Sequence, residues 1–298
     1  MKWRGRRTSN NIDDRRGMSS GRRSVNMGGG LAKLLIPLVL KLITTKKGLI
    51  IVAVVLGFMY FTGNNPLQLL TGGSSNQIEN TNYKGSAHEN ELAAFSATVL
   101  ADTEDVWNRL LNGYKEPTLV LFTNSVSSAC GSASSATGPF YCPGDQKLYI
   151  DLSFFQEMEN RLNAPGDFAQ AYVIAHEVGH HIQKLMGTTD KMQRLRGQIS
   201  KIEYNKLSVK LELQADFLAG VWAHHSQKMH QFMEKGDLQE ALNAAHAIGD
   251  DRLQKKSTGR VVPDSFTHGT SAQRMRWFKK GFDTGDVNQG DTFSASSL

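Results

Sequence analysis

The sequence predicts an α+β protein in which a mostly helical domain with a small β-sheet is preceded by a disordered basic head and one transmembrane helix. Three observations predict this class. The first residues are rich in Arg, Gly and Ser, one uncharged apolar run follows, and the remainder holds two strand-like segments and then long helical periodicity. We therefore divide the 298 residues into a basic, largely disordered head (1–47), an apolar segment (48–70), a flexible linker (71–88) and a folded domain (89–298).

The head carries most of the positive charge. Residues 1–47 hold twelve Lys and Arg against Asp13 and Asp14, a charge of +10, so the net charge of +6 leaves −4 for the rest. A basic segment directly before an apolar run is typical of the cytoplasmic side of a membrane protein. Nucleic-acid binding is the alternative, but Trp3 is the one aromatic residue among these arginines, and we expect no nucleic-acid partner.

The apolar run from Gly48 to Phe61 has no charged residue and follows Lys46 and Lys47. A bilayer span needs about 17–25 residues, so we expect the helix to extend toward Leu70. A cleaved signal peptide is the alternative, but no Ala-x-Ala site follows the run. The prediction is a single-pass protein of the bacterial inner membrane with a cytoplasmic N-terminus and a periplasmic folded domain.

Cys130 and Cys142 are the two cysteines of the chain. In the oxidising compartment that this topology implies, they could form a disulfide, worth about 3 kcal/mol for a loop of this size. A metal-binding pair or two free thiols are the alternatives. Their spacing is poor for a zinc finger, so we favour the disulfide.

The folded domain begins with a predicted helix, continues with two strands and is then helical almost to its end. Residues 118–122 (TLVLF) and 147–151 (KLYID) have strand-like composition, with a Gly/Ser-rich loop between them. Helical periodicity and capping residues predict helices over 89–111 with an interruption near Ala101 and Asp102, over 153–162, over 168–186 between an Asp167 cap and Gly187, over 190–235 with a bend near Gly197, over 237–253 after an Asp237–Glu240 capping box, and over 271–281.

The segment His176-Glu-Val-Gly-His180 carries the chemistry. Residues four apart on a helix share one face, so both imidazoles can bind one metal ion. Glu177 is offset by about 100° and can act on a water molecule as a general base without being a ligand. The composition gives an expected number of His-Glu-x-x-His matches of about 0.01. Two surface histidines on a solvated helix are the alternative, which the apolar flanking residues disfavour.

A catalytic zinc ion usually has three protein ligands. A metzincin would supply His-x-x-Gly-x-x-His, but position 183 is Gln and position 186 is Met, which excludes that class. Glu212 is the best candidate, because it is a carboxylate in an apolar stretch and therefore needs a partner. Asp216, one turn later, would accept the far N–H of a ligand histidine. The alternative is a solvated face on which both acids pair with nearby lysines.

Four segments together resemble the bacterial family of neutral zinc metallopeptidases: 172–181 (YVIAHEVGHH), 212–216 (ELQAD), 249–253 (GDDRL) and 261–270 (VVPDSFTHGT). The likeness covers nearly the whole chain, including the Arg-rich head and 138–142 (GPFYC). The resemblance implies a zincin-like domain in which His176 and His180 bind zinc and Glu177 is catalytic.

A looser likeness is to gluzincins of the CaaX prenyl endopeptidase type. There a Glu-x-x-x-Asp motif supplies the third ligand, as Glu212 and Asp216 would here, and a later His followed six residues on by Arg helps to hold substrate or oxyanion. His268 and Arg274 match that pair. The chain departs from that type in having one predicted membrane span, so prenylated substrates do not follow.

These observations predict a membrane-anchored zinc metalloendopeptidase acting on peptide or protein substrates. A zinc-activated water would attack the peptide bond, with Glu177 as general base and His268 or Arg274 at the oxyanion. One of the strands over 118–122 and 147–151 would bind substrate by strand addition. The alternative function is a non-catalytic, membrane-tethered scaffold or partner-binding module in which zinc is structural and Asp216 or His268 closes a four-ligand site.

Overall fold

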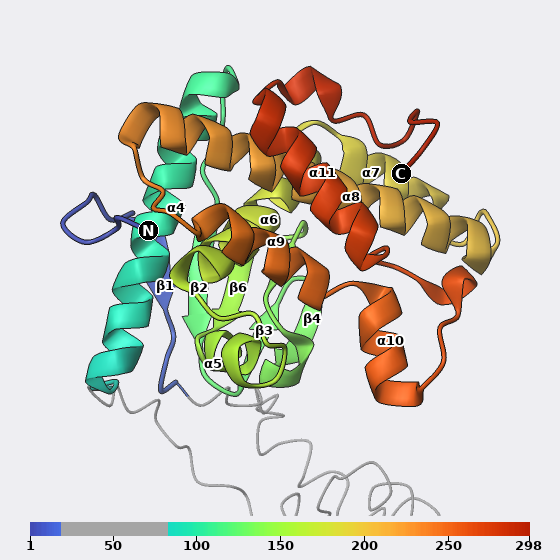
Figure 1. The fold of residues 1–298 in the computed structure, drawn as a ribbon. Helices are drawn as coiled ribbons and strands as arrows, with labels where there is room; N and C mark the ends of the chain where they lie inside the picture. Colours follow the sequence, from blue (N-terminus) through green and yellow to red (C-terminus); the bar gives the residue numbers. More distant parts are fainter. Residues whose placement is uncertain (19–82) are drawn as a thin grey trace, which may run out of the picture. The chain divides into compact units, whose positions relative to one another are not determined.

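A four-stranded sheet lies against the motif helix in the computed structural model, which describes residues 1–18 and 83–298 (Figure 1). The strand order is β1 (Ile12–Asp14), β2 (Thr118–Phe122), β6 (Lys147–Asp151) and β5 (Phe140–Cys142). The first three are parallel, and β5 runs antiparallel to β6. A separate hairpin pairs β3 (Ser125–Ser128) with β4 (Gly131–Ser134). The two predicted strands are confirmed, and the other four were not predicted.

Helices make up most of the rest, so the mostly helical α+β class is confirmed. They are α4 (Ala87–Leu110), α5 (Ser153–Asn160), α6 (Asp167–Leu185), α7 (Thr188–Leu195), α8 (Lys201–His230), α9 (Asp237–Ala247), α10 (Asp250–Thr258) and α11 (Ser271–Thr284). Short 3₁₀ turns cover Ser135–Thr137, Pro263–Ser265 and Val287–Gln289. The helix α6 contacts the sheet on one side and α8 and α9 on others, so the motif it carries lies at the centre of the fold.

Five details of the predicted helices are wrong. The predicted helix over 237–253 is two helices, α9 and α10, and the expected cap Asp167 is instead the first residue of α6, whose N-cap is Gly166. The helix α4 is continuous, because Ala101 and Asp102 are buried in its middle. The predicted helix over 190–235 is two helices, α7 and α8, separated around Gly197, whose φ is +79°. The predicted capping box at Asp237 is not formed, because Glu240 accepts a hydrogen bond from the backbone N–H of Phe168 instead (3.1 Å).

Two close helix crossings position the site residues. A Cβ atom at Gly179 on α6 would lie 2.9 Å from the carbonyl oxygen of Ala215 on α8, so only glycine lets the two helices approach this closely. Ala215 sits between Gln214 and Asp216, and the contact therefore brings the Glu212–Asp216 turn of α8 against the histidines of α6.

The second crossing joins α8 to α11. A Cβ atom at Gly281 would lie 2.0 Å from the carbonyl oxygen of Phe217, and one at Gly220 would lie 2.1 Å from that of Phe278. Glycines on both helices allow backbone contact. The capping box between Thr270 and Gln273 begins α11 just before Arg274. This crossing brings that arginine to Asp216.

The start of the head is folded, so the predicted disorder is wrong for residues 1–18. Its strand β1 extends the sheet beside β2, and the Trp3 ring packs edge-on against Phe95 with centroids 5.4 Å apart. Arg7 donates to the buried Glu104 (3.0 Å). Arg4 and Arg7 thus pair with acids of α4, and Arg15 and Arg16 pair with Asp13 and Asp14 of the head itself. An arginine-rich composition alone therefore does not distinguish this folded segment from a disordered tail.

The predicted inner-membrane localisation is wrong. Within residues 1–18 and 83–298, no helix has the length and apolarity needed to cross a bilayer. Residues 1–18 also belong to the same compact unit as residues 83–298, whereas the prediction placed the head and the domain on opposite sides of a membrane. The segment 48–70 proposed as the span lies outside the described residues.

The predicted disulfide is confirmed. Cys130 and Cys142 are bonded, with a sulfur–sulfur distance of 2.03 Å. The bond ties the turn between β3 and β4 to the end of β5, and so holds the hairpin against the last strand of the sheet.

Candidate metal centre

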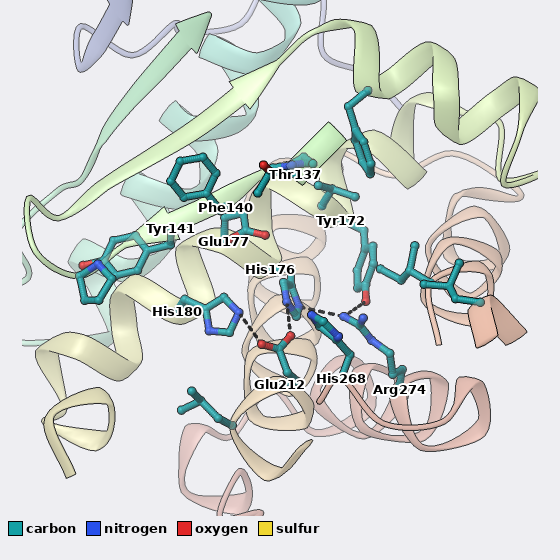
Figure 2. Close-up of a pocket in the computed structure, with 18 of the residues that line it drawn as sticks. Thr137, Phe140, Tyr141, Tyr172, His176, Glu177, His180, Glu212, His268 and Arg274 are labelled. Atoms are coloured by element: carbon teal, nitrogen blue, oxygen red, sulfur yellow. Dashed lines mark hydrogen bonds and ion pairs between the residues drawn. The ribbon is translucent and has the colours of Figure 1, made fainter. Parts of the chain in front are cut away.

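Three side chains from two helices converge on one point (Figure 2). The Nε2 atom of His176 lies 3.2 Å from Oε2 of Glu212, and Nε2 of His180 lies 3.4 Å from Oε1 of the same carboxylate. Two ligands about 2.1 Å from a tetrahedral zinc ion are themselves about 3.4 Å apart. Two imidazole nitrogens and a carboxylate at this separation are suitable zinc ligands.

The far nitrogen of each imidazole is held by an acceptor, which fixes the ring. His176 donates its Nδ1–H to Asp216 (2.8 Å), and His180 donates its Nδ1–H to the Oε1 atom of Gln183 (2.9 Å). The amide nitrogen of Gln183 donates to the carbonyl of Leu211 (2.6 Å), so its oxygen must face the histidine. Both rings consequently present the lone pair of Nε2 to the centre when neutral.

Asp216 is the hub of a fully buried network. Besides His176, it accepts hydrogen bonds from Tyr172 (2.5 Å) and from two nitrogens of Arg274 (2.8 and 2.9 Å). Burial alone would raise the pKa of Asp216, but the Arg274 guanidinium and His176 hold it below its ordinary value. Removing one partner of such a pair costs about 3–5 kcal/mol, because it leaves a buried charge uncompensated.

The electrostatics of the three converging side chains favour a cation at their centre. Burial works to lower the pKa of His176, but Asp216 and Glu212 raise it to about 10. Burial opposes ionisation of Glu212, yet the two imidazoles hold its pKa well below its usual range. The carboxylate therefore stays ionised and requires positive charge beside it, which protons on the imidazoles or one divalent cation would supply.

Glu177 lies next to this centre and faces a cleft of about 500 Å³. The cleft is bounded by β5 with its preceding turn, by α6 and α8, and by the segments that carry Ile248, Leu253 and His268. Glu177 is 8% exposed, and none of the described residues hydrogen-bonds to its carboxylate. A nearly buried carboxylate without a protein partner is free to accept a proton.

His268 lies at the cleft on a loop that Asp250 holds in place. The Oδ2 atom of Asp250 accepts the backbone N–H groups of Thr267 (2.7 Å), His268 (2.6 Å) and Gly269 (3.2 Å). Its Oδ1 atom lies 3.3 Å from Nδ1 of His268, and this bond raises the pKa of the imidazole. The ring therefore carries positive charge over a wider pH range, while its side chain remains 49% exposed.

Arg274, which the sequence placed with His268 as a candidate for the oxyanion, lies behind the ligand histidine His176 instead. It is 2% exposed and directs Nε and Nη2 at Asp216. Figure 2 shows its guanidinium beside Tyr172 and His176. These bonds make Arg274 a positioning residue behind His176 and Asp216, and leave His268 as the candidate for the oxyanion.

The comparison with known families agrees with this centre. The model of the family described as "Putative neutral zinc metallopeptidase" matches residues 1–293. The chain belongs to this family. Protein YpfJ of Escherichia coli (strain K12) is 49% identical over 300 residues, which cover 99% of this chain and 100% of YpfJ. Protein Rv2575 of Mycobacterium tuberculosis (strain H37Rv) is 45% identical over 204 residues, which cover 65% of this chain and 68% of Rv2575. No solved structure matches the chain.

In this family member, the structure brings together His176, His180, Glu212 and Asp216, as the sequence predicted. The alternative of a solvated face is wrong, since Asp216 is 0% exposed. Gln183 was missed, although its place three residues after His180 on the same helix face was a signal. Asp250 was missed because only the folded loop places it near His268.

The strands expected to bind substrate are not available for that role. Both edges of β2 are paired, with β1 and β6, and both edges of β6 are paired, with β2 and β5. Among the described strands, β5 is the one at the cleft with a free edge, and its Phe140 and Tyr141 line the cleft. Tyr141 donates to Nδ1 of the buried His181 (3.0 Å), whose Nε2–H donates to the carbonyl of Lys115 (2.6 Å). His181 thus ties β5 to the motif helix.

Proposed function

We propose that this protein is a zinc-dependent metalloendopeptidase in which His176, His180 and Glu212 hold zinc and Glu177 is the general base. One observation carries the proposal: the unpartnered carboxylate of Glu177 faces the same cleft as three converging zinc-type ligands. Zinc, when bound, supplies Lewis-acid polarisation of the scissile carbonyl and acidifies a water molecule.

The side chains of the protein supply the other catalytic functions. Glu177 takes the proton of the attacking water and returns it to the leaving amine. His268, whose pKa is raised by its hydrogen bond to Asp250, donates a hydrogen bond to the oxygen that becomes negative. Asp216, Arg274 and Gln183 hold the two ligand imidazoles in one orientation.

In this proposal, the substrate binds to the free edge of strand β5. A peptide that pairs with β5 would extend the sheet by one strand and lie along the cleft beside Glu177. Such pairing uses backbone groups, so it selects an extended, unfolded segment rather than a folded surface.

The alternative, a non-catalytic binding module with structural zinc, is less well supported. A structural zinc ion usually has four protein ligands. The convergent group among the described residues has three, His176, His180 and Glu212. Asp216 and His268, the expected fourth ligands, instead bond to Arg274 and Asp250. An arrangement with three ligands beside a cleft favours the enzyme.

The test is Glu177→Gln in the zinc-loaded full chain, assayed on an unfolded, fluorescently quenched protein substrate. We expect cleavage to fall about 10²–10⁴-fold, with unchanged zinc content by elemental analysis, because Glu177 is not a ligand. Full activity of the variant would remove Glu177 as the base. Zinc-loaded wild type that binds unfolded substrate and never cleaves it would favour the binding module.

A further inference from the structure

Part of the lining of the cleft is apolar. Val173 precedes Glu177 by one turn on the same face of α6. Phe154 of α5, Ile248 after α9 and Leu253 of α10 line the same cleft. Phe154 and Ile248 also pack against the hydrophobic core, so they are fixed in place. Leu253 is 36% exposed and lies at the solvent side.

Each charged group that lines the cleft already has a role in the proposed function, as a zinc ligand, general base, oxyanion donor or positioning residue. The residues that line it include Glu177, Glu212, Arg274 and the three imidazoles of His176, His180 and His268. Among residues 1–18 and 83–298, no other lysine, arginine, aspartate or glutamate lines it. Arg274 is fully paired with Asp216. The cleft therefore offers no free charge with which to recognise a charged substrate side chain, while an apolar side chain would find apolar walls.

We propose that Phe154, Val173, Ile248 and Leu253 form a pocket that receives one bulky apolar side chain of the substrate. The inference rests on the proposed function and adds the substrate class. One helical turn places Val173 about 5–6 Å from Glu177 along α6, a distance spanned by about two residues of an extended peptide. The recognised residue thus lies within two positions of the scissile bond, and cleavage selects sites flanked by Leu, Ile, Met or Phe.

The experiment digests a proteome-derived peptide library with the zinc-loaded full chain and maps the new termini by mass spectrometry. Leu253→Lys places a positive charge at the pocket and is not among the ligands or their partners. Ile202→Lys is the matched control, because Ile202 is 47% exposed on α8 and does not line the cleft. Both variants should retain wild-type zinc content.

For wild type we expect enrichment of large apolar residues at one position within two residues of the cut, with kcat/KM about 10–200-fold higher than for Asp, Lys or Gly there. Leu253→Lys should lose this preference, mainly through KM, and accept acidic residues, while Ile202→Lys keeps the wild-type profile. Cleavage without any preference at these positions, or a wild-type profile for Leu253→Lys, would overturn the pocket and leave the peptidase intact. No cleavage of any peptide would overturn both.

Discussion

Among the residues that the structure describes, two groups of three side chains that could hold a metal ion lie along α6, and they differ in what surrounds them. His176, His180 and Glu212 form one, and Asp167, Asp237 and Glu240 form the other, near the start of the helix. In each group, the potential ligand atoms lie within 4.8 Å of one another. Proximity alone therefore does not distinguish them.

The difference lies in the partners. The acidic group already neutralises a cation, since the α-amino group of Met1 lies 2.8 Å from Asp167 and 3.4 Å from Asp237. Glu240 accepts the backbone N–H of Phe168, and the Oδ2 atom of Asp237 that faces the Met1 amine also accepts the backbone N–H of Glu234. Glu240 therefore satisfies an N–H group in the first turn of α6, and the two aspartates pair with the Met1 amine.

The histidine group is arranged in the opposite way. Its outer atoms are held by Asp216 and Gln183, while its inner atoms face one another and border the cleft. A metal site is therefore distinguished by support behind the ligands and, among the described residues, by ligand atoms that no ammonium group already pairs with. The following predictions test this distinction, beginning with the largest effect.

Glu212→Ala should weaken zinc binding by more than 100-fold, since it removes a ligand and leaves two imidazoles that repel each other when protonated. Asp237→Ala, the matched change in the acidic group, should bind zinc within twofold of wild type. The measurement is competition against a chromophoric chelator, with elemental analysis of the dialysed proteins. Equal zinc affinities for Glu212→Ala and wild type would remove Glu212 as a ligand.

Gln183→Leu should weaken zinc binding by about 10–100-fold, the usual cost of losing the acceptor behind a ligand histidine. The variant frees the Nδ1–H of His180 and allows the ring to rotate. Gln198→Leu is the control, because the side chain of this exposed residue has no hydrogen-bond partner among the described residues. Unchanged affinity for Gln183→Leu would show that packing of α6 alone orients His180.

The convergence of His176, His180 and Glu212 in the candidate site could be predicted because local rules govern it. The spacing of His176 and His180 follows from helical periodicity, and Glu212 stands out as an acid in an apolar stretch. Glycines in both α6 and α8 were visible, but the crossing that Gly179 permits depends on the partner helix. The sequence therefore indicated which residues meet, and left the helix geometry that brings them together undetermined.

The hydrogen-bond partners that support the site, and the folding of residues 1–18, could not be predicted because they depend on tertiary structure. Asp250 reaches His268 across 18 residues, and Glu240 caps a helix 72 residues away, against the local capping box expected for it. The basic head looked like a cytoplasmic tail because composition does not reveal that Arg7 faces a buried Glu104. Short strands such as β1 and β5 carry too few residues for a pattern of alternation.

Glu240→Gln should slightly stabilise the protein at neutral pH, the smallest effect of the series. Partial burial raises the pKa of Glu240, with Asp167 and Asp237 adding to the shift. Because the folded state binds this proton more tightly than the unfolded state, stability falls as pH rises from the ordinary value of 4.5, and the loss is complete once the pH exceeds the raised pKa. The amide of Gln retains an oxygen for the N–H of Phe168 and removes the charge.

Thermal unfolding of the two proteins measures this difference. At pH 7 the variant should melt about 1–3 °C higher, which corresponds to about 0.5 kcal/mol, and the gain should vanish below about pH 4, where both side chains are neutral. Glu159→Gln, at an exposed position of α5, should show no such pH dependence. A lower melting temperature for Glu240→Gln at pH 7 would mean that its charge is needed to balance the Met1 amine, and that the acidic group is a tighter cation site than its helix-capping bonds indicate.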